Sequence, residues 1–270
     1  MNYAELIKGI ARYGSSAEDI CKQVLGISGK QIKSRVIVAP WWEPSVFSDL
    51  GKKIELVTEV CSLKIWNIVT DSYEISYLKT GIGAPVLTDV VLTLGLTNCK
   101  KVLFIGSVGS LTEDISIGDI VLPEFSICGD GTSRYLKGSP LKVNDPFGEK
   151  VFPDRQLFEE LKKLTKNICN DNNVKYHVGQ AFSIDSIFAQ FAYIDEIKKM
   201  GCNVIEMETA AAFRAAKMAN IPLVAAFSVS DNTAVNKSLI SGRTASDKKY
   251  RKEVRRTIFP KIILGLFKDN

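Results

Sequence analysis

The chain has 270 residues, of which 46% are hydrophobic, and its 35 basic and 30 acidic side chains give a formal net charge of +5. This length and composition suit one large α/β domain over residues 1–270. The charges are interspersed, which argues against a nucleic-acid partner. No apolar run approaches the roughly 20 residues that cross a bilayer, which argues against a membrane partner. A basic cluster at 248–256 is interpreted as the solvated face of a terminal helix.

Cysteine and histidine usage narrows the chemistry further. The six cysteines lie at scattered positions without CxxC spacing, and no secretory leader is visible, which is typical of a reduced, cytoplasmic protein. His177 is the only histidine, so a multi-histidine metal site is excluded, and we interpret this residue as structural. We therefore expect no metal and no cofactor. The chemistry is expected from carboxylates, hydroxyls, backbone amides or lysines.

The first part of the chain predicts an arm followed by strands. Residues 1–30 indicate an N-terminal helical arm. A turn at 80–85 opens a helix, because Pro85 suits the first helical position. Between the arm and this turn, strand-like apolar runs occur at 35–39, 54–60, 63–69 and 73–79, with a hairpin turn at 71–72.

Two segments of small residues are candidate anion sites. Gly81 and Gly83 let the backbone approach a ligand, and the N-terminus of the following helix favours an anion. The apolar strand 101–105 runs into 106–110, whose small residues can form a nest of backbone N–H groups. The spacing matches neither a Walker loop nor the dinucleotide-binding fingerprint. A plain strand-to-helix turn is the alternative for 80–85.

The rest of the chain alternates strands and helices. Because both helical crossovers and hairpins are predicted, the expected fold is α/β: a three-layer α/β/α sandwich with a mixed central sheet. The later elements are strands at 117–123 and 178–183, a polar loop at 129–135, and helices at 154–171, 191–200 and 245–267.

The stretch 203–231 organises the predicted site. An apolar run ends at Glu206 and Glu208, a small-residue helix follows, and a second apolar run ends at Asp231. Strand, helix and strand at this spacing predict a βαβ unit with parallel strands. Ligands bind at the carboxyl ends of such strands, so three carboxylates are expected on one rim. Exposed strand ends or a helix cap are the structural alternatives for these acids.

Seven short segments match one family in chain order. They are residues 80–85, 105–111, 118–121, 130–133, 182–185, 204–210 and 229–231. On these segments the sequence resembles the nucleoside phosphorylase and nucleosidase family, which includes purine nucleoside phosphorylase, uridine phosphorylase, methylthioadenosine nucleosidase and AMP nucleosidase. The resemblance implies an enzyme that cleaves the N-glycosidic bond of a nucleoside, with a purine favoured. It also implies a homo-oligomer, because relatives form dimers, trimers or hexamers.

The resemblance implies ribose and base roles for the carboxylate stretch. Glu208 matches the glutamate that holds the ribose hydroxyls, Met207 matches the methionine packed on the sugar, and we place Glu206 beside them. Asp231 matches the residue that protonates or hydrogen-bonds a purine base at N7, and we place Ser230 with it at the base. Burial raises the pKa of a carboxyl group, which keeps such a proton available near neutral pH. Asp231 and Glu208 are therefore the expected catalytic residues.

The resemblance also implies residues for the rest of the base site and for the acceptor. Ile187 falls where many relatives hold a base-stacking aromatic residue, and Phe188 lies beside it. Ser107 and Gly83 lie where relatives hold phosphate or water. Lys79 directly precedes the glycine turn and is a candidate cation for the same site.

The resemblance fails at the phosphate-binding arginines. Phosphorylase relatives commonly have an arginine at the position of Phe104, and a Gly-Asp-Pro-x-Arg turn where this chain has 42–46. No arginine occurs between Arg35 and Arg134, so Lys79 or Arg134 would have to substitute. Phosphate is the acceptor that the family favours. Water, as in the nucleosidases, and a nucleoside-binding protein without catalysis are the alternatives.

Overall fold

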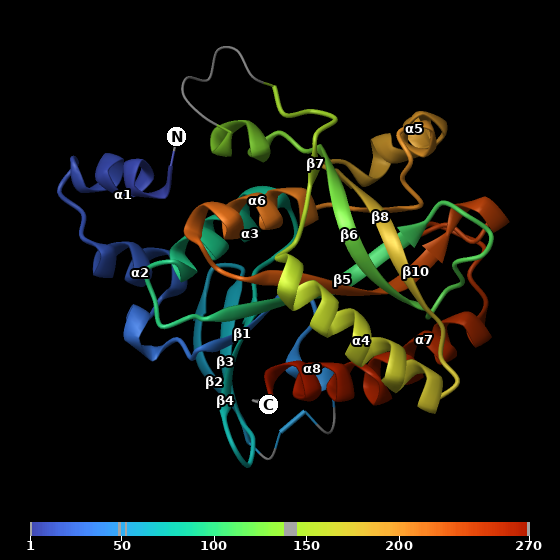
Figure 1. The fold of residues 1–270 in the computed structure, drawn as a ribbon, viewed down its shortest axis with the longest axis horizontal. Coiled ribbons are helices and arrows are strands. Elements are labelled where there is room, and N and C mark those ends of the chain that lie inside the picture. Colours follow the sequence, from blue (N-terminus) through green and yellow to red (C-terminus); the bar gives the residue numbers. More distant parts are fainter. Residues whose placement is uncertain (1, 48–49, 52, 138–144, 269–270) are drawn as a thin grey trace.

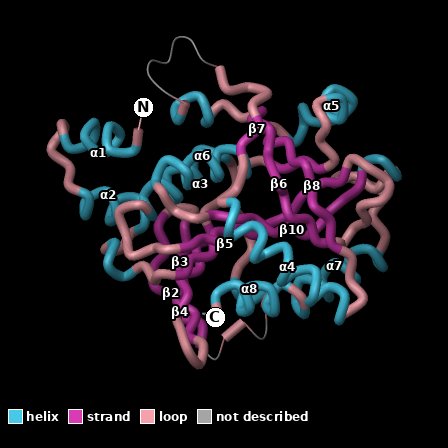
Figure 2. The backbone as a smooth tube through the Cα atoms, viewed as in Figure 1, coloured by secondary structure: helices cyan, strands magenta, loops and turns pink. Residues whose placement is uncertain are grey.

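The structure, a computed structural model, describes residues 2–47, 50–51, 53–137 and 145–268. One mixed sheet of ten strands runs through them (Figures 1 and 2), which confirms the expected mixed sheet. The strands are β1 (Arg35–Ala39), β2 (Lys53–Val60), β3 (Leu63–Val69), β4 (Glu74–Lys79), β5 (Lys101–Ser110), β6 (Ile120–Gly129), β7 (Lys150–Val151), β8 (Tyr176–Ile184), β9 (Val204–Glu206) and β10 (Leu223–Asn232).

Five of the strands close into a ring. Their order is β5, β9, β8, β6 and β10, and β10 pairs again with β5. Closing a sheet on itself satisfies the backbone groups of both edges. Strands β1, β4, β3 and β2 continue outward from β5 as an open extension, and β7 pairs with β6. Strand β5 is therefore shared by the ring and the extension.

Helices cover both faces of the sheet, which confirms the three-layer arrangement (Figures 1 and 2). Helices α3 and α6 pack over one face, and α4, α7 and α8 pack over the other. No helix in the described part of the chain combines the length and apolarity that crossing a membrane requires. The helices are α1 (Tyr3–Ala11), α2 (Ala17–Leu25), α3 (Ala84–Leu94), α4 (Arg155–Asp171), α5 (Ile187–Lys199), α6 (Thr209–Ala219), α7 (Ala245–Thr257) and α8 (Phe259–Phe267).

Strand β1 shows why two separate cores form. Successive side chains of a strand point to opposite faces of the sheet. Val36 and Val38 join the core that contains residues of α3 and α6. Ile37 and Ala39 join the core that contains residues of α4, α7 and α8. A continuous apolar run is therefore what a strand covered by helices on both faces requires.

The predictions for two segments are wrong. The predicted nest at 106–110 is part of β5, because these residues pair in register with β10. Their backbone groups are thus engaged in a ladder instead of facing a ligand. The predicted terminal helix 245–267 is divided into α7 and α8, because Pro260 lacks an N–H and occupies the first turn of the second helix.

The predicted βαβ unit with parallel strands is also wrong. Strand β9 runs antiparallel to the end of β5, whereas β10 runs parallel to β5 along most of its length. The two strands joined by α6 therefore run in opposite directions, on either side of β5. Strand β9 is only three residues long and pairs with β8 on its other side, so it completes the ring instead of adding to a parallel sheet.

Candidate active site

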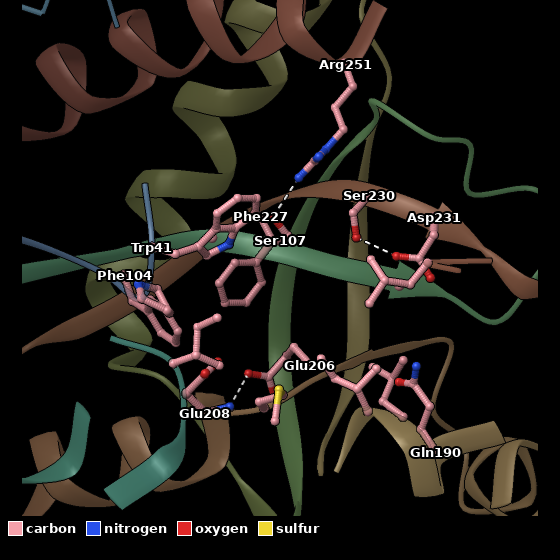
Figure 3. Close-up of a pocket in the computed structure, with 18 of the residues that line it drawn as sticks. Trp41, Phe104, Ser107, Gln190, Glu206, Glu208, Phe227, Ser230, Asp231 and Arg251 are labelled. Atoms are coloured by element: carbon pink, nitrogen blue, oxygen red, sulfur yellow. Dashed lines mark hydrogen bonds between the residues drawn. The ribbon is translucent and has the colours of Figure 1, made fainter. Parts of the chain in front are cut away.

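A cavity of about 270 Å³ lies where β5, β9 and β10 meet (Figure 3). All three predicted carboxylates, Glu206, Glu208 and Asp231, line it. Side chains from α5, from α7 and from the loop after β1 complete the wall. The lining also includes four further residues expected from the sequence, namely Met207, Ile187, Ser230 and Ser107.

The acids converge because β5 has β9 on one side and β10 on the other. Gly109 of β5 pairs with Ile205 of β9 and also with Asp231 of β10. A Cβ atom at Gly109 would lie 3.0 Å from Oδ2 of Asp231 and 3.3 Å from Cγ2 of Ile205. A Cβ atom here would therefore be tightly packed, since the two flanking strands bring their side chains over Gly109.

A β-bulge in β10 presents two successive side chains to the cavity. Val229 pairs with Val108 and Asp231 pairs with Gly109, so Ser230 is the extra residue between two register positions. Bulges change the direction of side chains that would otherwise alternate between the faces of a sheet. As a result, both Ser230 and Asp231 line the cavity.

Glu206 organises the start of α6. Its Oε1 accepts a hydrogen bond from the hydroxyl of Ser183. Its Oε2 accepts hydrogen bonds from the backbone N–H groups of Glu208 and Thr209, at 2.6 and 2.7 Å. Burial raises the pKa of Glu206, while these donors act in the opposite direction. Both oxygens are thus engaged by the protein, so Glu206 orients the segment that carries Glu208.

Glu208 is 5% exposed, and its Oε1 accepts a hydrogen bond of 2.8 Å from the backbone N–H of Gly83. Gly83 has a φ of 115°, which glycine adopts without strain. The glycine turn therefore serves the site by directing an amide at a carboxyl group, although Gly83 is not part of the cavity wall. Burial, and then the nearby charge of Glu206, raise the pKa of Glu208 to about 8.

Asp231 is 4% exposed, and its Oδ1 lies 2.5 Å from the hydroxyl oxygen of Ser230. The same hydroxyl lies 3.1 Å from the carbonyl oxygen of Val108, which can only accept. A hydroxyl has one proton, so both contacts are hydrogen bonds when Asp231 carries a proton. Burial raises the pKa of Asp231, against the lowering effects of Ser230 and of the charge of Arg243. Burial, the largest of these effects, therefore favours a protonated Asp231, while the hydrogen bond from Ser230 and the charge of Arg243 oppose it.

Only one of the two predicted base-stacking residues reaches the cavity. Ile187 lies at the start of α5 and lines the wall, whereas Phe188 points away and is 92% exposed. Gln190, one turn further along α5, is a cavity residue that the sequence interpretation missed. The predicted helix started at 191, but α5 begins at Ile187 after an N-cap at Ser186. Placing the helix start correctly would have put Ile187 and Gln190 on one face.

The two cations proposed from the sequence lie elsewhere. Lys79 forms an ion pair with Glu43, with 2.7 Å between Nζ and Oε1, and is not part of the cavity wall. Arg134 forms an ion pair of 2.6 Å with Asp145, also away from the cavity. Neither side chain contributes charge directly to the wall of this site.

Arg251 of α7 is a cavity residue that the sequence interpretation missed. Its Nη2 donates a hydrogen bond of 2.6 Å to the hydroxyl oxygen of Ser107 (Figure 3). The cluster 248–256 was interpreted as a solvated face, which is wrong for Arg251, since it lines the cavity. A signal was available, because Arg251 lies three residues before the buried Val254 and so shares its helix face. The members that are solvent-exposed are Lys248, Lys249, Lys252 and Arg256.

Arg243 and an aromatic wall were missed as well. Arg243 precedes α7, lines the cavity and donates a hydrogen bond of 2.7 Å to the carbonyl oxygen of Leu239. Phe104 and Phe227 meet edge to face, with ring centroids 4.9 Å apart, and Trp41 lies on the same wall. The loop position of Arg243 carries no periodicity, so no local pattern would have identified it.

His177 lies outside this cavity. Its Nε2 is 2.8 Å from Oδ2 of Asp119, and this contact ties β8 to the turn before β6. That placement agrees with the structural interpretation of His177. Among the residues that the structure describes, no group of three or more His, Cys, Asp or Glu side chains is arranged to hold a metal ion.

Buried acids, a hydroxyl and guanidinium groups around one cavity are typical of a site that binds a small molecule. The chain belongs to the Phosphorylase superfamily, whose family model matches residues 36–258. The family expected from the sequence is therefore confirmed.

Individual relatives differ in what they act on. A guanosine phosphorylase from Halorubrum lacusprofundi is 29% identical over 171 residues, which are 63% of this chain and 66% of that protein, just under two thirds of its length. A uridine phosphorylase structure from Vibrio fischeri matches with a TM-score of 0.74 at 22% identity, over 95% of this chain and 99% of its own. An AMP nucleosidase structure from Bacteroides thetaiotaomicron matches with a TM-score of 0.63 at 17% identity, over 80% and 90%. The two structural likenesses show a shared fold.

Proposed function

We propose that this protein cleaves the N-glycosidic bond of a purine nucleoside and transfers the pentose to phosphate. The observation that carries the proposal is that two buried acids, Asp231 and Glu208, line one cavity. Breaking this bond develops positive charge on the sugar and sends the bonding electrons to the base. The sugar and the base therefore need different partners, and the cavity holds two acids in different surroundings.

Asp231 is proposed as the general acid for the departing base. Its carboxyl group is buried, and the contacts of Ser230 are satisfied when Asp231 is protonated. Transfer of that proton to N7 of the purine would neutralise the charge that the base gains as the bond breaks. General acid catalysis of this kind accelerates reactions by roughly 10²–10⁴-fold.

Glu208 is proposed to hold the ribose. Its Oε1 is fixed by the backbone N–H of Gly83, and Met207 offers an apolar surface next to it on the cavity wall. Hydroxyl groups that donate to a carboxylate favour its charged form. Nucleoside binding should therefore lower the pKa of Glu208 from about 8. Glu206 orients this segment through its bonds to the start of α6.

The base end combines apolar and polar groups. Ile187 presents an aliphatic side chain and Gln190 an amide from the same face of α5, and both line the cavity together with Ser230 and Asp231. An amide can both donate to and accept from a purine edge. The similarity to a guanosine phosphorylase supports a purine over a pyrimidine.

Hydrolysis is the second candidate. Phe104 lines the cavity at the position where phosphorylase relatives carry an arginine, and it packs against Phe227. An aromatic side chain supplies no positive charge to bind phosphate. Water is neutral and needs no positively charged partner. The fold is shared with an AMP nucleosidase structure as well as with a uridine phosphorylase structure, so the likeness of fold does not favour either acceptor.

The test is release of free base from a panel of purine and pyrimidine nucleosides, with and without phosphate. We expect release from purine nucleosides that depends on phosphate, with pentose 1-phosphate as the second product. Asp231→Asn should lower turnover at least about 10²-fold, the low end for losing a general acid. Equal release in both buffers would select hydrolysis instead.

Asp195→Asn is the matched control, because Asp195 is an exposed acid on the outer side of α5. It should leave turnover unchanged. If Asp231→Asn turned over as fast as this control, Asp231 would not be the general acid. If the unmodified protein bound nucleosides but released no base from any of them, the proposed function would be wrong.

A further inference from the structure

Three arginines near the cavity lack a negative partner. Arg243 and Arg251 line the wall, and Arg255 lies one turn after Arg251 on α7, above the ring of Trp42 at 5.1 Å. In the described part of the chain, no carboxylate forms an ion pair with any of the three. By contrast, Arg134 and Arg214 each contact a carboxylate oxygen, at 2.6 and 3.2 Å.

Arg251 is the one of the three that contacts Ser107. Its Nη2 donates to the Ser107 hydroxyl at 2.6 Å, and its Nε, like that of Arg255, is buried without a hydrogen-bond partner. A neutral hydroxyl does not compensate for removing a guanidinium group from water. Burial, and then the charge of Arg255, lower the pKa of Arg251 to about 10. The local surroundings are therefore short of one negative charge.

Asp231 forms no ion pair with Arg251, although its charge acts on the pKa of Arg251. Burial raises the pKa of Asp231, and the hydrogen bond from Ser230 opposes that shift. A ligand that brings negative charge to Arg251 would satisfy the site without removing the proton from Asp231.

The position of Arg251 relative to Ser107 is informative. Phe104 and Ser107 lie on the same strand, β5, and Phe104 occupies the place where phosphorylase relatives carry an arginine. Arg251 reaches the Ser107 hydroxyl from α7 instead (Figure 3). In that view Glu206 and Glu208 lie on the side of the cavity away from Arg251, and Asp231 lies at a third position.

We infer that Arg251, together with Arg243 and the hydroxyl of Ser107, binds the phosphate dianion that accepts the pentose; this inference rests on the proposed function. The planar guanidinium group presents paired N–H donors that match two phosphate oxygens, which a lysine cannot do. An oxygen of the bound phosphate forms the new bond to C1′ as the bond from C1′ to the base breaks. The bonding electrons leave with the base, which takes up the proton of Asp231.

The test compares three substitutions on one helix. Arg251→Gln removes the positive charge, and Arg251→Lys keeps the charge but lacks the paired N–H donors of the guanidinium group. Arg256→Gln makes the matched change at an exposed arginine of α7. The measurements are the KM for phosphate and the KM for nucleoside. Arg251→Gln should raise the KM for phosphate at least about tenfold, which equals about 1.4 kcal/mol. The KM for nucleoside should change less than about twofold, because the ribose and base contacts remain.

Arg251→Lys should fall between the wild type and Arg251→Gln, and Arg256→Gln should match the wild type. An unchanged KM for phosphate in Arg251→Gln would overturn the inference. A nucleoside 5′-monophosphate serves as a second substrate, because its own phosphate has the same chemistry. If Arg251→Gln impaired cleavage of the nucleotide but not phosphate-dependent cleavage of the nucleoside, the anion would be the substrate's phosphate, and the inference would be wrong.

A direct measurement of phosphate binding distinguishes loss of the phosphate site from misfolding of a variant. Phosphate that binds only the folded protein raises its melting temperature. We expect this shift in the wild type and in Asp231→Asn, and a smaller shift in Arg251→Lys and in Ser107→Ala, which removes only one hydroxyl. Equal shifts in all four proteins would overturn the inference. Failure of this inference can be told apart from failure of the proposed function. If the proposed function fails, no base is released at all, whereas the phosphate inference concerns base release that persists with an altered phosphate requirement.

Discussion

The two halves of the cavity are built in different ways. The half assigned to sugar and base comes from one stretch of chain: Glu206, Glu208 and Asp231 lie within 26 residues. The half assigned to the acceptor joins Ser107 of β5 to Arg251 of α7, which are 144 positions apart. The first half can be recognised from the order of residues along the chain, whereas the second exists only after α7 has packed against the sheet.

The halves also differ in how their charges are satisfied. The oxygens of Glu206 receive hydrogen bonds from Ser183 and from two backbone N–H groups, and Glu208 receives one from Gly83. Arg251 has only the neutral hydroxyl of Ser107 and a buried, unpartnered Nε. Glu206 is thus fully engaged within the protein, whereas Arg251 has no carboxylate partner, and this difference supports the proposal that a ligand brings negative charge to Arg251.

Removal of Glu208 should lower catalysis more than the substitution of Gly109 does. Glu208→Ala takes away the proposed partner of the ribose hydroxyls, and hydrogen bonds to charged groups contribute about 1.5–3 kcal/mol each. We therefore expect kcat/KM for the nucleoside to fall about 10²-fold. Glu196→Ala, at an exposed position of α5, is the control and should behave as the wild type. A small loss in Glu208→Ala would remove Glu208 from the ribose site.

Gly109→Ala tests the convergence of β9 and β10. The added Cβ would lie 3.0 Å from Asp231 and 3.3 Å from Ile205, so the side chains must move by a few tenths of an ångström. Misplacement of a catalytic group by about 1 Å can cost 10²-fold, so a decrease of kcat by about tenfold is expected here. Gly9→Ala is the control, because nothing lies within 4 Å of a Cβ at that position. Unaltered kcat would mean that Asp231 need not occupy this position.

The raised pKa of Glu208 predicts a smaller, pH-dependent effect on stability. Between about 4.5 and about 8 the folded protein binds the Glu208 proton more tightly than the unfolded chain, so this residue lowers the free energy of unfolding as pH rises. Glu208→Gln has no such proton. Its stability relative to the wild type should therefore increase with pH across this window, by up to about 1.4 kcal/mol per pH unit.

Urea unfolding at several pH values between these limits measures the difference. Glu196→Gln, at an exposed site on α5, is the matched control. A difference for Glu208→Gln that varied with pH no more than that of this control would mean that Glu208 lacks the raised pKa. In that case the nucleoside would meet a carboxylate that is already charged.

Local patterns predicted much of the fold. The apolar runs located the strands, and the alternation of strands and helices indicated the three layers. Boundaries were less reliable: α5 starts before the predicted 191, and Pro260 divides the predicted last helix. The nest at 106–110 was wrong because β10 supplies partners for these backbone groups, which is a long-range pairing.

The sequence by itself determined which acids line the cavity, because Glu206, Glu208 and Asp231 end apolar runs and match a family pattern. Only the tertiary structure decided how they meet: β9 and β10 run in opposite directions on either side of Gly109, not side by side as parallel strands. It also decided that Arg251 turns inward to Ser107 while its exposed neighbours on α7 remain in solvent. The physical reason is that periodicity along a chain reports local structure, whereas strand direction and helix docking depend on contacts between residues far apart in the sequence.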